Sequence, residues 1–165
     1  MNFWRMKMYP DGDTAWAANN VPWILEHKGF IGMGKWDKSF KQNEDFVKRM
    51  KTGDIVSMMI YDRLVALVQV TAPAVELNSE KIEYDGGYGY RVFGESDNLN
   101  WLVYRRPVRV LDWNIGNVRK PVEAGPTSTL VYCDNLDAPS NKAIVDWFKD
   151  VCASFEKRGI AQLLD

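Results

Sequence analysis

Residues 54–71 constrain the fold of this chain more than any other stretch, because they form two long apolar runs separated by a short polar turn. The runs cover Ile55–Tyr61 and Leu64–Val70, with Asp62 and Arg63 between them. A strand with one face in water alternates apolar and polar residues, whereas both of these runs are apolar on both faces. The pattern therefore predicts a β-hairpin buried on both sides, as in a small barrel with flanking helices.

Other strands are indicated by two-residue alternation and by turn residues at their ends. Residues 73–100 have weak patterns and many turn residues, so we expect a long excursion there with strand pieces near 88–93. Pro107 lacks a backbone donor and indicates an edge, a bulge or a bend in its strand. Outside the hairpin, the predicted strands are 3–9, 29–37 with a site at its end, 101–113 and 130–133.

Helix starts are indicated by capping residues and by prolines. Ser39 and Gln42 have capping-box spacing, and an apolar stripe follows them as far as Met50. Residues 138–141 supply start signals for an amphipathic closing helix. Two earlier helices are expected, one from Asp13 or Thr14 through Ala18, and one from Pro22 to just before Gly29.

Length and composition favour one globular unit. The chain has 165 residues, of which 46% are hydrophobic and 26% charged, and no repeat or linker divides it. We therefore predict an α+β fold, a small mixed β-barrel with flanking helices, as a single domain spanning 1–165. The net charge of −1 gives no long-range field toward nucleic acid or an anionic membrane, so any such partner must meet a local patch.

The two cysteines, Cys133 and Cys152, are too few for a disulfide scaffold and lack zinc-site spacing. No secretory signal and no apolar run of membrane-spanning length is present. We expect a soluble cytoplasmic protein with no membrane partner.

Catalytic motifs are weak throughout. His27 is the only histidine, which excludes a His-dependent triad or a two-histidine metal site within one chain. Residues 29–35 approach a phosphate-binding loop, but Trp36 stands where a magnesium-binding hydroxyl is needed. No nucleophile elbow or dinucleotide fingerprint occurs. We expect no cofactor, no resident metal and no catalysis.

Trp36 stands out among the seven tryptophans because it lies at the end of a predicted strand, between Lys35 and Asp37, with Lys38 next. A flat π-face, a carboxylate that accepts from an exocyclic amine, and cations for phosphate are what a protein needs to hold a flipped base. The alternative for Asp37 is a role in starting the helix that follows. We predict a pocket at this strand end.

Basic and aromatic residues also alternate in residues 101–109. Here Trp101 or Tyr104 could stack on a base while Arg105 and Arg106 meet phosphates. A solvated edge strand with protective charges is the other interpretation.

Several of these segments together resemble the PUA superfamily, and within it the EVE and YTH-like domains that read modified bases. The resemblance covers roughly residues 1–72 and, more loosely, 101–113. Its pieces are the first strand ending in residues 7–10, the tryptophan-bearing helix, residues 29–36, the helix leading into 51–56, and the hairpin.

The resemblance implies a small barrel whose aromatic cage holds a methylated or otherwise modified base flipped from DNA or RNA. It implies an association with restriction nucleases or motor proteins in prokaryotes. Two departures matter: Met8 ends the first strand where readers often place a small polar residue, and 73–100 has no counterpart. By motif position the cage falls on Tyr9, Trp16, Trp23, Trp36 and Tyr61, with Asp37 as a polar reader.

We therefore expect a non-enzymatic reader with Trp101 as a further base contact. Its phosphate contacts would be Lys35, Lys38, Arg105 and Arg106. One alternative is an RNA-processing or nuclease-like enzyme that uses Asp11, Asp13 or Glu26 as acid-base groups. Another is a protein-interaction domain that buries exposed tryptophans against a partner.

Overall fold

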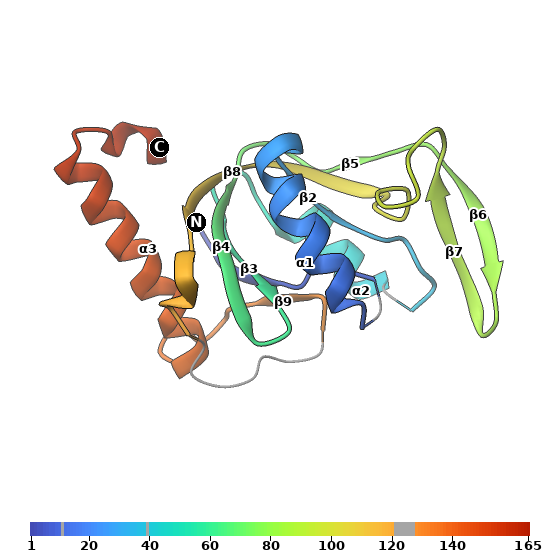
Figure 1. Cartoon of the computed structure of the whole chain (residues 1–165), viewed down its shortest axis with the longest axis horizontal. Coiled ribbons are helices and arrows are strands. Elements are labelled where there is room, and N and C mark those ends of the chain that lie inside the picture. Colours follow the sequence, from blue (N-terminus) through green and yellow to red (C-terminus); the bar gives the residue numbers. More distant parts are fainter. Residues whose placement is uncertain (11, 39, 121–127) are drawn as a thin grey trace.

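A computed structural model describes residues 1–10, 12–38, 40–120 and 128–165. Figure 1 shows a curled sheet with helices packed on it and a separate two-stranded hairpin, β6–β7, at the end of the molecule opposite the helix α3. The predicted α+β class and barrel-like sheet are confirmed.

The predicted hairpin forms the middle of the sheet. It consists of β3 (Ile55–Ile60) and β4 (Arg63–Val70), which are antiparallel and joined at Tyr61. Every residue of β3 is buried, as the two-sided apolar pattern requires. The sheet has the strand order β2-β8-β4-β3-β1-β9.

The sheet curls because β8 (Tyr104–Trp113) pairs with different strands along its two halves. Its second half pairs with β4, and its first half pairs with β2 (Phe30–Met33) and with the short β5 (Val75–Glu76). Pro107 lies near the changeover, opposite Phe30. The strand therefore bends at the residue that the sequence marked as an edge, bulge or bend.

The chain begins in β1 (Phe3–Met6), which runs parallel to β3, and β9 (Leu130–Tyr132) closes the edge beside it. β1 is shorter than the predicted strand 3–9. The Lys7 amide still donates to the Thr129 carbonyl beyond the end of β1, and the chain then bends at Tyr9 and Pro10. A parallel pair requires a crossover, and the helices between β1 and β3 provide it.

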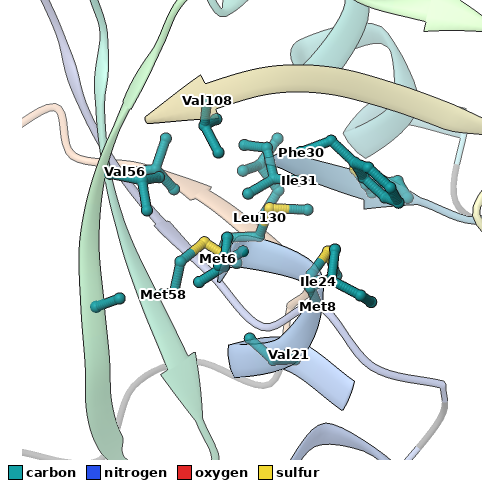
Figure 2. Close-up of a cluster of buried hydrophobic side chains, with 14 of the residues drawn as sticks. Met6, Met8, Val21, Ile24, Phe30, Ile31, Val56, Met58, Val108 and Leu130 are labelled. Carbon is teal, nitrogen blue, oxygen red and sulfur yellow. The ribbon is translucent and has the colours of Figure 1, made fainter. Parts of the chain in front are cut away.

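The concave side of the sheet encloses the main core. Figure 2 shows Met6 of β1 beside Met58 of β3, and Met8 beside Ile24, in one cluster that also holds Val21; all five side chains are buried. The other side is covered by α3 (Pro139–Lys157), whose Trp147 is fully buried and donates from Nε1 to Asp112 Oδ2 at 2.7 Å. The closing helix is therefore confirmed, and the sheet is covered on both sides.

The prediction of two separate helices in 13–28 is wrong. Asp13 does cap the helix, because its Oδ1 accepts from the Trp16 amide at 2.9 Å. However, α1 (Thr14–Trp23) contains Pro22 and continues directly into the wide helical turn η1 (Ile24–Lys28). The missing Pro22 donor would have reached the carbonyl of exposed Ala18, which water can satisfy.

Of the predicted capping box at Ser39 and Gln42, the structure describes only Gln42. The helix α2 (Phe40–Glu44) continues into a second wide turn, η2 (Asp45–Arg49), and Ser39 lies outside the described residues. Gln42 instead accepts from the Leu130 amide through Oε1 at 2.8 Å and fastens the helix to β9.

The excursion 73–100 forms a defined hairpin of β6 (Ser79–Tyr84) and β7 (Gly87–Val92), more regular than the strand pieces expected there. No helix in the described part of the chain is long and apolar enough to cross a membrane. Two short turns of helix complete the structure, η3 (Ile115–Asn117) and η4 (Ala161–Leu164).

Candidate functional site

Three tryptophans from distant parts of the chain pack together beside the end of β2. The rings of Trp36 and Trp101 are parallel within 3°, with centroids 5.7 Å apart. Trp16 of α1 meets Trp101 edge to face at 5.2 Å, and its Nε1 donates to the Asn98 carbonyl. A Cβ on Gly34 would lie 2.9 Å from the Trp36 ring, so this glycine allows the indole to pack onto the backbone.

The β6–β7 hairpin closes over the same segment. Trp36 bridges to Gly89, and the Asp37 amide donates to the Tyr88 carbonyl at 3.3 Å. A Cβ on Gly89 would collide with the Trp36 indole, and one on Gly87 would collide with the Asp37 carboxylate. The glycines of β7 therefore permit the hairpin to approach this closely.

A cavity of about 660 Å³ lies on one side of Trp36, within the size range of small-molecule sites. Its lining comes from the chain after β1, the start of α1, the chain after β2, the end of β6 and the residue before β9. We call it the Tyr9 cavity. Its lining residues are Tyr9, Pro10, Asp13, Trp36, Lys38, Tyr84 and Thr129.

Hydrogen bonds hold the polar groups of the Tyr9 cavity in place. The Tyr9 hydroxyl accepts from the Tyr61 amide at 3.2 Å. Tyr84 donates its hydroxyl to Asp37 Oδ1 at 3.1 Å, which orients that carboxylate beside the cavity. Aromatic walls, the Asp13 carboxylate and the exposed Lys38 line the cavity and can together bind a flat ring that carries amine donors and a phosphate.

A second depression of about 500 Å³ lies between the helical segment α2–η2 and the strands β5, β7 and β8. It shares Trp36 with the Tyr9 cavity. We call it the Phe40 groove. It is lined by the rings of Trp36, Phe40, Tyr88, Tyr90 and Tyr104 and by the charged groups of Lys35, Asp37, Glu44, Lys48 and Glu76.

Lys35 is engaged inside the Phe40 groove. Its Nζ lies 2.6 Å from Glu76 Oε1 and 4.7 Å from the centroid of the Tyr90 ring. The hydrogen bond between the two side chains raises the pKa of Lys35 and lowers the pKa of the Glu76 carboxyl. Burial raises the pKa of Tyr104 beside them. The polar groups of Lys35, Glu76 and Tyr104 form the polar part of the groove lining, which we call its polar floor.

Two of the predicted cage residues, Trp23 and Tyr61, line neither depression. Trp23 ends α1 with 44% of its surface exposed, and its neighbours are His27 and Lys28. Tyr61 occupies the β3–β4 turn and is 63% exposed. The fold thus brings together Tyr9, Trp36 and Lys38 at the cavity, and places Trp16 and Trp101 behind Trp36.

The two predicted phosphate-binding arginines are turned inward. Arg106 is 2% exposed, and its guanidinium donates to the carbonyls of Phe46, Val47, Met50 and Ala72. The Arg105 guanidinium donates to the carbonyls of Leu99 and Leu102 and pairs with Glu95 at 2.8 Å. The assignment of Arg106 to phosphate is therefore wrong, because an alternating strand in a curled sheet directs this side chain into the interior.

The two described acidic residues of the enzyme alternative, Asp13 and Glu26, lie far apart. Asp13 begins α1, whereas Glu26 lies in the continuous helical segment that follows, about 20 Å away at 1.5 Å per residue. Asp11 lies outside the described residues. Within the ranges that the structure describes, no three His, Cys, Asp or Glu side chains form a metal-ligand group.

Rings of the β6–β7 hairpin line both depressions, although no sequence motif assigned them to a site. Tyr84 reaches the Tyr9 cavity, and Tyr88 and Tyr90 line the Phe40 groove. The available signal was the tyrosine repeat at 84, 88 and 90 among the glycines 86, 87 and 89, which predicts ring-bearing strands that can approach another segment closely.

The fold and the site define an α+β protein with a curled sheet and two aromatic depressions that share one tryptophan. No protein-family model matches the chain, and no curated protein matches it.

Proposed function

We propose that this protein is a non-catalytic nucleic-acid reader that holds a flipped, modified base in the Tyr9 cavity. The observation that carries the proposal is the convergence of Tyr9, Trp36 and Lys38 on one cavity. Aromatic walls receive the base, and the carboxylate of Asp13, which lines the cavity, offers an acceptor for an exocyclic amine. Asp37 lines the Phe40 groove instead and is joined to the cavity through its hydrogen bond with Tyr84.

Phosphate contacts in this proposal are few. Lys38 lines the Tyr9 cavity and is exposed, whereas Arg105 and Arg106 are engaged within the protein. The chain carries a net charge of −1, so stacking supplies most of the affinity, at about 1–3 kcal/mol per base. We expect modest affinity with selectivity set by the shape of the cavity.

The proposal is tested by titration against short fluorescent oligonucleotides at one fixed salt concentration. The panel contains DNA and RNA strands, each either plain or carrying a methylated adenine, a methylated cytosine or a hydroxymethylated cytosine. We expect one modified strand to bind at least about tenfold more tightly than its plain counterpart. Equal weak binding to every strand would contradict the proposal and favour a protein partner.

Two variants locate the site. Trp36→Ala removes a cavity wall, so we expect it to abolish the preference for the modified strand. Lys38→Ala changes an exposed side chain, so we expect weaker binding to all strands and a salt dependence reduced by about one phosphate contact. Trp23→Ala is the matched control, because this tryptophan lies outside both depressions. An unchanged preference in Trp36→Ala would remove the Tyr9 cavity from consideration.

A further inference from the structure

The Phe40 groove exposes aromatic rings that base binding in the Tyr9 cavity does not use. Phe40 opens α2 with 71% of its surface exposed, and Tyr88 of β7 is 37% exposed. Exposed rings on two different elements that line the same depression form a surface suited to a flat ligand.

The charges in the groove indicate the kind of ligand. Lys35 pairs with Glu76 at 2.6 Å, and Lys48 pairs with Glu44 at 3.1 Å. Both ammonium groups already face carboxylates. The groove is therefore better suited to binding an uncharged ring than to binding a phosphate. A nucleobase is uncharged, flat and edged with donors and acceptors, and it matches both the aromatic walls and the polar floor.

The position of the groove relates it to the Tyr9 cavity. Trp36 lines both depressions, while Asp37 lines the groove and Lys38 lines the cavity. Three consecutive residues therefore form the partition between them. A strand that places a flipped base on one side of this partition carries its neighbouring nucleotides past the other side, and enzymes that flip bases also contact such flanking nucleotides.

We infer that the Phe40 groove is a second stacking subsite, which takes the unpaired base next to the flipped one on the exposed rings of Phe40 and Tyr88. This inference rests on the proposed function, because it requires a strand bound in the Tyr9 cavity. It makes the protein a reader of two adjacent bases, one selected by modification and one bound by stacking.

The test combines a protein change with a strand change. The strand is the modified oligonucleotide that binds best, with an abasic residue placed on either the 5′ or the 3′ side of the modified base. The protein is wild type, Phe40→Ala or Phe40→Leu. Phe40 is largely exposed, so these variants should keep the fold, and Phe93→Ala changes a ring that is 60% exposed but does not line the groove.

In the wild type, we expect one of the two abasic strands to bind about fivefold to a hundredfold more weakly, the range for loss of one base stack. Phe40→Ala and Phe40→Leu should lose a similar factor on the intact strand and show little further loss on that abasic strand. Such coupling indicates a direct contact between the ring and the base. Phe93→Ala should behave as the wild type.

Three outcomes would overturn the inference. In the first, binding is selective, but neither an abasic neighbour nor Phe40→Ala weakens it. This result would leave the Tyr9 cavity as the base-binding site and rule out the second subsite. Full affinity in Phe40→Ala together with loss of a co-purifying protein would assign the groove to a protein partner. Absence of binding to every oligonucleotide would contradict the proposed function itself, and the second subsite with it.

Discussion

Trp36 and Trp101 stack in parallel, with ring centroids 5.7 Å apart and an angle of 3° between the planes. Trp101 is held in turn by the edge of Trp16. The candidate base-contacting ring is therefore supported from behind by a second ring before any ligand arrives. Such preorganisation reduces the ordering cost of binding.

The first prediction concerns that support. Trp101→Ala should lower the free energy of unfolding by about 1–3 kcal/mol, because the change removes a half-buried ring packed between two others. It should also weaken binding of the preferred oligonucleotide by leaving Trp36 mobile. Urea unfolding and the fluorescence titration measure the two effects. A loss of stability with unchanged affinity would mean that Trp36 needs no support.

The second prediction concerns the approach of the hairpin. Gly89→Ala adds a Cβ that collides with the Trp36 indole, so β7 must move away. We expect a loss of about 1–3 kcal/mol in unfolding free energy and an altered near-ultraviolet circular dichroism signal from the tryptophans. Glu83→Ala, on the exposed side of β6, is the control. An unchanged signal would show that the hairpin does not rest on Trp36.

The third prediction separates structural from ligand-binding arginines. Arg106→Lys keeps the charge but replaces a fork that reaches four carbonyls with a single ammonium. We expect a loss of about 2–4 kcal/mol in unfolding free energy, because buried carbonyls lose their donors. Binding by the folded fraction should not change. If Arg106→Lys had the stability of the wild type but bound oligonucleotides more weakly, Arg106 would be a phosphate contact after all.

The fourth prediction concerns pH. Burial raises the pKa of the Cys133 thiol to about 11, from an ordinary value near 9. Because the folded state favours the neutral thiol, this contribution to stability is complete below about pH 9 and is lost as the pH rises toward about 11. Comparison with Cys133→Ala isolates it from other groups that titrate there.

We therefore expect the wild type to lose up to about 3 kcal/mol more stability than Cys133→Ala across this window. Urea unfolding at several pH values measures the difference. Parallel curves for the two proteins would contradict a shielded thiol. Reaction of Cys133 with a thiol reagent should likewise be slow in the folded protein at pH 8.

Local sequence pattern was sufficient to predict an element wherever the pattern lay within a single segment. The two-sided apolar runs predicted the β3–β4 hairpin, and the amphipathic stripe predicted α3. Pattern failed at Pro22, which lies inside a helix because packing of Val21 and Ile24 in the core outweighs one missing hydrogen bond. It also failed at Arg106, because alternation alone does not say which face of a bent strand points inward.

The sequence by itself predicted the β3–β4 hairpin, the closing helix and a pocket at the strand end near Trp36, and the family resemblance grouped Tyr9 with it. Only the tertiary structure decided that Trp101 stacks behind Trp36, that Tyr84 and Tyr88 reach the site from a hairpin, and that a second groove shares its wall. The physical reason is the sequence separation over which each interaction acts. Hydrophobic period and turn chemistry act between residues close in sequence, whereas the depressions arise where segments distant in the chain pack together, which depends on sheet curvature and on glycines that permit close approach.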